Sequence, residues 1–208
     1  MPVAKAEPGR LDPAAGTPAR RRPARRPSDE ATGVLAAVRM FGLERNSGAA
    51  FGSAVHALLA EVEWSGAGGV TKFATAWAAH GPAGEEALAC LRAPGLASVW
   101  ARPSARAEIW RERAFEVVLD GVWYTGVFDR VVIERDATGR AGSAWVIDYK
   151  TDQAKAGEEA ARIIEKHAGQ LDLYRRAAGV LTGLPGKRVK CALVMTASQI
   201  LVEVPPPA

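Results

Sequence analysis

The chain has 208 residues, of which 48% are apolar and 24% are charged, a composition typical of one globular domain with tails. It contains no apolar run of transmembrane length and no apolar signal core, so we predict neither a membrane protein nor a secreted one. Two cysteines, Cys90 and Cys191, are too few for a disulfide framework or for a four-cysteine zinc or iron–sulfur site. The expectation is therefore a cytoplasmic protein without an iron–sulfur cluster.

Residues 1–30 differ in composition from the rest of the chain. They hold six of the thirteen prolines, and their seven basic and four acidic residues account for +3 of the net charge of +4. We predict that this segment is a disordered tail or linker and that residues 31–208 form the folded domain. The basic stretch ARRRPARRP, residues 19–27, is either a solvated linker or an arm that contacts phosphate.

The first part of the folded region is predicted to be helical. Residues 48–64 carry an apolar stripe at helical spacing, formed by Phe51, Val55, Leu58 and Val62. Ser47 is a suitable N-cap for this helix. Residues 70–80 and 83–92 are predicted as two further helices separated by Gly81-Pro82, and Pro94-Gly95 is expected to end the helical region.

Strands follow. Residues 114–120 and 122–134 are predicted to be two strands joined by a tight turn at Asp120-Gly121, and residues 144–150 form a third strand after a second turn. Residues 157–181 return to helix, with a buried stripe of Ile163, Ile164, His167, Leu171, Tyr174 and Ala178. Residues 188–196 are predicted to be a buried strand, with residues 199–204 as its edge partner. This order of elements predicts an α/β fold with a central mixed sheet flanked by helices and a helical N-terminal portion.

The stretch VIDYKTD, residues 146–152, places charged side chains inside an apolar strand. Because residues two apart share a face of a strand, Val146, Asp148 and Lys150 are expected to point one way, and Ile147 and Tyr149 the other. Asp129 lies in the preceding strand, which should be the neighbour of this one. Two carboxylates on adjacent strands can share Mg²⁺ or Mn²⁺, and Lys150 beside them could orient a water and stabilise phosphate charge.

Structural interpretations remain open for each of these features on its own. An Asp-x-Lys strand is often a surface ion pair of little energetic value, and Asp129 with Arg130 could mark only the end of a strand. A lone helical histidine such as His56 is usually a satisfied core residue. His80 and His167 have no motif around them and are treated as structural or surface residues.

Four motifs together resemble the RecB/AddA-type nuclease domains of the PD-(D/E)XK superfamily. They are GSAVHALLAEVEW, GVFDR, VIDYKTD and QLDLY, and they occur in the order found in that family, between about Gly48 and Val204. The resemblance implies a restriction-endonuclease-like core. It also implies that His56, Asp129 and Asp148 bind the metal, together with the backbone carbonyl of Tyr149.

The same resemblance implies the remaining roles. Lys150 is expected to be catalytic together with Asp148 and Asp129. Gln170 and Tyr174 match the helix motif Gln-x-x-x-Tyr that borders the active site, and Glu112 matches an acidic position before the first strand, with an accessory role. In this family the cofactor is Mg²⁺, for which Mn²⁺ can substitute.

The function that follows is a metal-dependent DNA nuclease, expected to be an exonuclease in DNA recombination and repair. Such domains are normally the C-terminal part of, or a partner to, a UvrD-like helicase, and this chain has no phosphate-binding loop of its own. Two alternatives stay open: a catalytically silent nuclease-like domain that binds DNA or holds subunits together, and a structural protein with unrelated ion pairs.

Overall fold

The strands that carry Asp129 and Asp148 are neighbours in one mixed sheet. A computed structural model of the chain describes residues 24–25, 43–65, 69–151 and 160–204. In the sheet the strand order is β1-β3-β4-β5-β6, with β2 paired to β3, and the pairs β1·β3 and β4·β5 are parallel whereas the others are antiparallel. The strands are β1 (Ala24–Arg25), β2 (Ala107–Leu119), β3 (Val122–Arg135), β4 (Ala141–Lys150), β5 (Val189–Met195) and β6 (Ile200–Val204).

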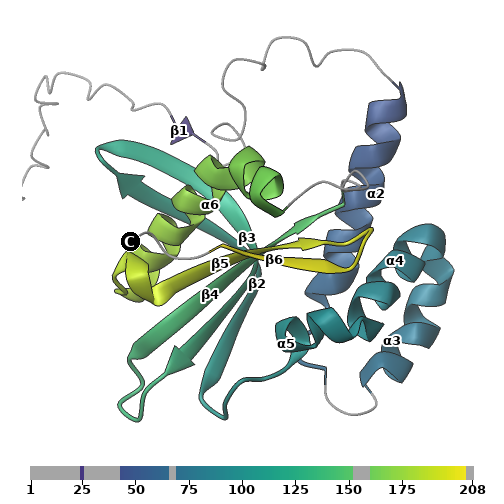
Figure 1. Cartoon of the computed structure of the whole chain (residues 1–208), viewed down its shortest axis with the longest axis horizontal. Coiled ribbons are helices and arrows are strands. Elements are labelled where there is room, and N and C mark those ends of the chain that lie inside the picture. The colour runs from purple at the N-terminus through teal and green to yellow at the C-terminus, as the bar shows by residue number, and fades with distance from the viewer. Residues whose placement is uncertain (1–23, 26–42, 66–68, 152–159, 205–208) are drawn as a thin grey trace, which may run out of the picture.

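Helices cover both faces of the sheet (Figure 1). The long helix α6 packs on one face, and the N-terminal helices pack on the other, so that the sheet separates two hydrophobic cores. The helices are α2 (Leu43–Ala60), α3 (Gly69–Trp77), α4 (Gly81–Arg92), α5 (Ala97–Trp100) and α6 (Ala160–Thr182), with short 3₁₀ turns η1 (Ala78–His80), η2 (Pro94–Leu96) and η3 (Gly186–Arg188). The predicted α/β fold with a mixed sheet and a helical N-terminal portion is confirmed.

The hairpin between β2 and β3 has the predicted turn. Leu119 pairs with Val122, and the two turn residues, Asp120 and Gly121, have φ of 49° and 76°. Positive φ at both positions is the geometry of a type I′ turn, which suits the twist of the flanking strands. The hairpin extends beyond β4, because β3 pairs with β4 only from Arg130 onward.

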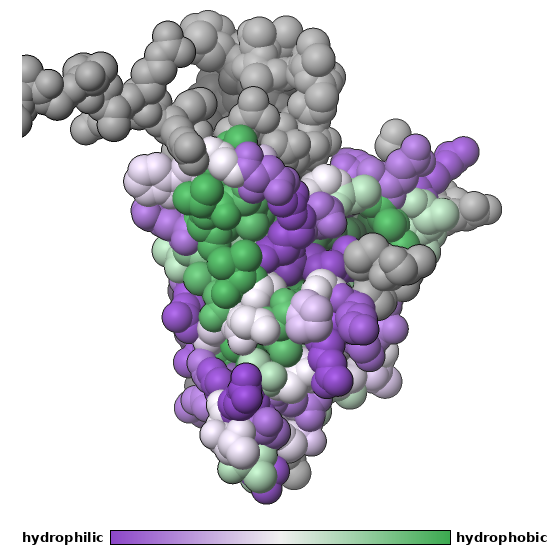
Figure 2. All heavy atoms as spheres, turned by 90° about the vertical axis from the view of Figure 1, so that its left-hand side faces the viewer, coloured by the Kyte–Doolittle hydropathy of each residue, from purple (hydrophilic) through white to green (hydrophobic). Residues whose placement is uncertain are grey.

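The outer face of this hairpin is partly hydrophobic. Val118 is 58% exposed, and Trp123 and Val127 are each 41% exposed. The tip of the hairpin lies at the left of Figure 1, and Figure 2 shows hydrophobic surface gathered on that side beside a hydrophilic stripe. Val127 also borders the cleft described below, so this surface continues into the candidate site.

Several predicted boundaries were wrong. Helix α2 begins at Leu43, so Ser47 lies inside the helix and is not its N-cap. Gly81 and Pro82 open α4, and Pro94 opens η2, because proline is tolerated in a first helical turn; the helical region therefore runs on through α5. Strand β2 begins seven residues before the predicted start, at Ala107. The start of α6 is described only from Ala160, so residues 157–159 lie outside the described residues.

None of the helices in the described ranges is both long enough and apolar enough to cross a bilayer.

Candidate metal centre and nuclease site

Strand β4 presents its side chains in the predicted alternation. Val146 belongs to the core beneath α6, whereas Ile147 and Tyr149 belong to the core formed with the N-terminal helices. Asp148 and Lys150 point toward α6, where both contact Gln170. One face of this strand therefore carries core residues, whereas the other carries the buried Val146 together with the two charged groups.

Strands β2 and β3 break this alternation at the site. In β3, Phe128 and Val131 are three residues apart and would face opposite sides of a regular strand, yet both lie in the core beneath α6. In β2, Glu112 has φ of 44°. The pairs Arg111–Arg130 and Arg113–Phe128 flank the distortion, so Glu112 lies opposite Asp129. A positive φ is unusual for a residue other than glycine and is often found at functional sites.

His56 joins these two carboxylates from α2. Its Nδ1 lies 3.3 Å from Oδ1 of Asp129, and its ring makes an edge-on contact with Tyr149. One ligand atom from each of His56, Glu112 and Asp129 lies within 4.8 Å of the others. Two carboxylate oxygens and an imidazole nitrogen form a donor set that suits a divalent cation such as Mn²⁺ or Mg²⁺.

Two arginines fix the end of the helix that carries His56. Arg111 and Arg130, which pair across β2 and β3, donate to carbonyl oxygens at and just beyond the end of α2: Arg111 to Ala60 at 2.6 Å, and Arg130 to Val62 and Glu63 at 2.7 Å each. Arg130 is completely buried, and its guanidinium stacks against Trp64 and Trp100. We call this pair the arginine clamp. Arg111 directly precedes Glu112 in sequence, and Arg130 directly follows Asp129. Because both arginines bind the end of the helix that carries His56, the clamp links the three candidate ligands.

Asp148 and Lys150 form a second group beside the first. The Nζ of Lys150 lies 2.8 Å from Oδ2 of Asp148 and donates to Oε1 of Gln170 at 2.9 Å. The amide nitrogen of Gln170 is 3.4 Å from Asp148 and 3.3 Å from the hydroxyl of Tyr174. That hydroxyl donates to the carbonyl of Val127 at 3.1 Å. Gln170 and Tyr174 thus connect α6 to both strands, as residues four apart on one helix face can.

His56 and Asp129 of the first group and all residues of the second line one open cleft of about 520 Å³. Its walls are the hairpin, α2 and α6, and its lining includes His56, Asp129, Asp148, Lys150, Gln170 and Tyr174. Glu112 lines the adjoining hollow together with His56. His80 and His167 line neither.

The pKa values of the site residues show that its carboxylates are crowded together and partly removed from water. Burial raises the pKa of Asp148, and the charge of Asp129 raises it further, to about 6, although Lys150 opposes the shift. Burial and the charge of Asp129 also raise the pKa of Glu112. For His56, burial lowers the pKa, but the hydrogen bond and charge of Asp129 outweigh it, and the net shift is upward. Burial is the main cause for Asp148 and Glu112, and in all three groups the charge of Asp129 raises the pKa as well, an effect that a bound cation would offset.

The structure thus brings together, at the cleft and the adjoining hollow, the side chains of all the site residues predicted from sequence except Tyr149, and the backbone N–H of Tyr149 is bonded to one of them, Asp129. It differs in one respect: Glu112, expected only as an accessory residue, lies in the group with His56 and Asp129, whereas Asp148 lies with Lys150 and Gln170. The arginine clamp was missed. Its signal in the sequence is Arg130 next to Asp129 in GVFDR, which had suggested only a strand end.

Comparison with protein families identifies the superfamily of the chain. A family model described as PD-(D/E)XK nuclease superfamily matches residues 34–204, most of the chain. The chain belongs to the PD-(D/E)XK nuclease superfamily. A search of curated proteins found no match.

Membership of this nuclease superfamily implies a nucleic-acid substrate and hydrolysis of phosphodiester bonds. The group of His56, Glu112 and Asp129 is of the kind that binds a divalent metal in such enzymes. The core α/β architecture, with a helical stretch before the sheet, is consistent with the superfamily.

Proposed function

We propose that this chain is a Mg²⁺-dependent deoxyribonuclease. The observation that carries the proposal is the convergence of His56, Glu112 and Asp129 next to the open cleft that Lys150 lines. Asp129 and Asp148 are both buried, and burial of two neighbouring carboxylates is costly unless a cation compensates it, which favours a metal site over a set of structural ion pairs.

The proposed metal ligands are His56, Asp129 and Asp148, with the carbonyl of Tyr149, and the geometry adds Glu112 to this set. His56, Glu112 and Asp129 are already close enough to share an ion, and Asp148 lies in the same cleft. Bound Mg²⁺ would neutralise charge on the scissile phosphate and lower the pKa of a coordinated water.

Lys150 is the proposed catalytic cation. Its ammonium can donate to the attacking water and to a phosphate oxygen, and its orientation is set by Asp148 and Gln170. Gln170 in turn is held by the Tyr174 hydroxyl, which is tied to Val127. We therefore assign Gln170 and Tyr174 a positioning role rather than a chemical one.

The proposal extends to the type of nuclease. The motifs around His56, Asp129 and Lys150 resemble RecB/AddA-type domains, which supports DNA as substrate, exonuclease action, a role in recombination and repair, and association with a UvrD-like helicase as domain or subunit. In this proposal residues 1–30 are the linker or arm, and residues 31–208 are the nuclease domain.

A catalytically silent nuclease-like domain is the competing hypothesis. It predicts that catalytic positions have been replaced, yet His56, Asp129, Asp148 and Lys150 are all present and line one cleft. The presence of all four supports cleavage.

The test is cleavage of end-labelled single-stranded and double-stranded DNA with Mg²⁺, with Mn²⁺ and with chelator. We expect metal-dependent cleavage of at least one substrate, and loss of that cleavage in Lys150→Ala. Binding of DNA without cleavage under every metal condition would favour the silent domain. Cleavage that persists in chelator would contradict the metal mechanism.

A further inference from the structure

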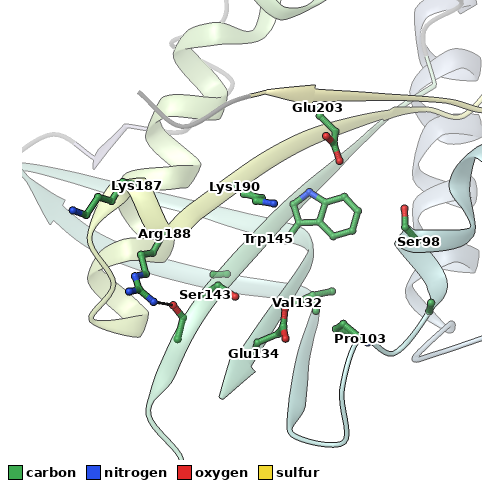
Figure 3. Close-up of a pocket in the computed structure, with 13 residues that line it drawn as sticks. Ser98, Pro103, Val132, Glu134, Ser143, Trp145, Lys187, Arg188, Lys190 and Glu203 are labelled. Atoms are coloured by element: carbon green, nitrogen blue, oxygen red, sulfur yellow. Dashed lines mark hydrogen bonds between the residues drawn. The ribbon is translucent and has the colours of Figure 1, made fainter. Parts of the chain in front are cut away.

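A second hollow lies on the opposite face of the sheet (Figure 3). Its volume is about 520 Å³, and none of its lining residues lines the catalytic cleft. Its floor is formed by strands β3, β4 and β5 through Val132, Trp145 and Lys190, and its ends are formed by η3 and by the segment after α5. Because Trp145 packs with the core of the N-terminal helices, the hollow lies on their face of the sheet, away from Asp148 and Lys150.

The hollow combines an aromatic ring with cations. Trp145 is half-buried, and it lies beside Lys190 because the two residues pair across β4 and β5. Lys187 and Arg188 lie at the end formed by η3, and Arg188 donates to the carbonyl of Gly142 at 3.1 Å, which holds its side chain at the rim. In Figure 3 Trp145 lies between these cations and the end marked by Ser98 and Pro103.

Three polar side chains of this hollow, those of Trp145, Lys187 and Lys190, have no hydrogen-bond or ion-pair partner among the described residues. The indole nitrogens of Trp77, Trp100 and Trp110 each donate a hydrogen bond, whereas those of Trp145, Trp64 and Trp123 have no partner among the residues that the structure describes. Lys187 and Lys190 likewise make no ion pair within the described ranges. An unpartnered indole N–H and two unpaired ammonium groups around a hollow are available to a ligand.

We propose that this hollow binds a nucleotide. The face of Trp145 offers a stacking surface for the base, and Lys187, Arg188 and Lys190 offer donors for the phosphate. The carboxylates of Glu134 and Glu203 also line the hollow, and Figure 3 shows Glu203 above the indole and Glu134 below it. Carboxylates accept hydrogen bonds from amino groups, so a base with an exocyclic amine, such as adenine, fits better than thymine.

The volume agrees with this ligand. Small-molecule sites typically enclose roughly 300–1,000 Å³, which a single nucleotide can fill. The nucleotide is either free or part of a DNA strand, since both present the same base and phosphate. The proposal does not depend on cleavage, because no residue of the hollow lies in the catalytic cleft.

Binding of deoxyadenosine monophosphate to the full chain, by calorimetry in chelator, tests the proposal. We expect measurable binding, and weaker binding of deoxyadenosine by about tenfold because the nucleoside has no phosphate for the cations to bind. Lys190→Ala should weaken binding of the monophosphate by about tenfold and leave that of deoxyadenosine unchanged. Trp145→Ala should weaken both by about fivefold or more, and Trp145→Phe, which retains an aromatic face and the packing, should weaken them less.

Three controls locate the ligand. Lys72→Ala removes an exposed lysine of α3 and should change nothing. Asp129→Asn and Lys150→Ala alter the catalytic cleft and should also leave binding unchanged. If these two variants weaken binding while the Trp145 and Lys190 variants do not, the nucleotide occupies the catalytic cleft and the proposal is wrong. Absence of any binding would also overturn it.

A short oligodeoxyadenylate, again in chelator, separates the two sources of the nucleotide. If the oligonucleotide binds more tightly than the monophosphate and its binding is weakened by the Trp145 and Lys190 substitutions, the site binds a DNA strand. If the oligonucleotide binds equally or more weakly and the same substitutions weaken its binding, the site binds a free nucleotide. Binding of both ligands that depends on neither residue would reject the site.

Discussion

The backbone N–H of Tyr149 donates a hydrogen bond to Oδ2 of Asp129, with an N–O distance of 2.7 Å. Regular pairing of β3 with β4 ends at Arg130 and Ile147, so this N–H has no ladder partner on β3 and the carboxylate takes its place. The bond fixes one oxygen of Asp129 and leaves Oδ1 directed at His56. The strand backbone therefore orients the central carboxylate of the candidate metal centre before any ion binds.

Removing the Lys150 ammonium should separate catalysis from metal binding. We expect Lys150→Ala to reduce DNA cleavage by about 100-fold or more, because the variant has no cation aimed at the developing phosphate charge. Mn²⁺ should still raise the melting temperature, since Lys150 is not a ligand. Asp148→Ala should also abolish cleavage and leave the fold intact. Cleavage at the wild-type rate in either variant would refute these roles.

The geometry makes Glu112 a stronger candidate ligand than its sequence position suggested. Glu112→Gln and Asp129→Asn should each weaken Mn²⁺ binding by about tenfold or more, measured by calorimetry. Glu116→Gln is the matched control, because Glu116 is an exposed acidic residue of the same strand that also lines the cleft. Equal weakening in Glu112→Gln and Glu116→Gln would show that only the general negative charge matters.

Asp148 should make the metal-free protein less stable as the pH rises. Its pKa is raised in the folded state, to about 6 from 3.8, so the folded protein loses stability as the pH rises from the lower to the higher value. Asp148→Asn, which cannot ionise, should match the wild type near pH 4 and be more stable at pH 8, by at most about 3 kcal/mol. Urea unfolding in chelator at both pH values measures this.

The control for this pH dependence is Asp172→Asn on the exposed side of α6. It should show no comparable change between the two pH values. A stability difference between wild type and Asp148→Asn that is constant with pH would mean that Asp148 is not responsible.

The arginine clamp should stabilise the fold and the metal centre together. Arg130→Ala removes buried hydrogen bonds to Val62 and Glu63 and leaves their carbonyls unpaired, so we expect the unfolding free energy to fall by about 3 kcal/mol or more. Arg106→Ala, at an exposed position, should change stability by less than about 0.5 kcal/mol. In any Arg130 variant that folds, Mn²⁺ affinity should also fall; unchanged affinity would show that His56 does not depend on the clamp.

The basic N-terminal segment is expected to contribute to DNA binding through charge. We predict weak, salt-sensitive binding by the chain. Deletion of residues 1–28 should flatten the salt dependence, by about 0.9 in log–log slope for each duplex phosphate that the segment neutralises. Cleavage at low salt should not change. Identical slopes for the full and truncated chains would show that the segment is only a linker.

A second variant separates charge from structure in that segment. Ala24 and Arg25 form β1 along the edge of β3, opposite Trp123 and Tyr124, and the deletion removes this strand as well. Substitution of Arg20, Arg21 and Arg22 by Gln leaves residues 24–25 in place. It should reproduce part of the change in slope.

The sequence alone predicted most of the elements and the alternation along β4, because periodicity determines which face of a regular strand a side chain occupies. It could not predict the position of Glu112, since the positive φ at this residue breaks the alternation on which such a prediction depends. The role of Arg130 was equally hidden. Its partners lie 67 and 68 residues away, and a buried arginine that binds carbonyls has no periodic signature.

The arginine clamp also bears on how the protein acquires its ion. The clamp sets the position of α2, and hence of His56, through bonds within the chain, so the ligands are in place before an ion arrives. A centre of this kind does not need to refold around its metal, and ions can exchange without disturbing the domain. If the proposed centre binds a metal, geometry would discriminate little between ions of similar size, and the relative concentrations of those ions would largely determine which one is bound.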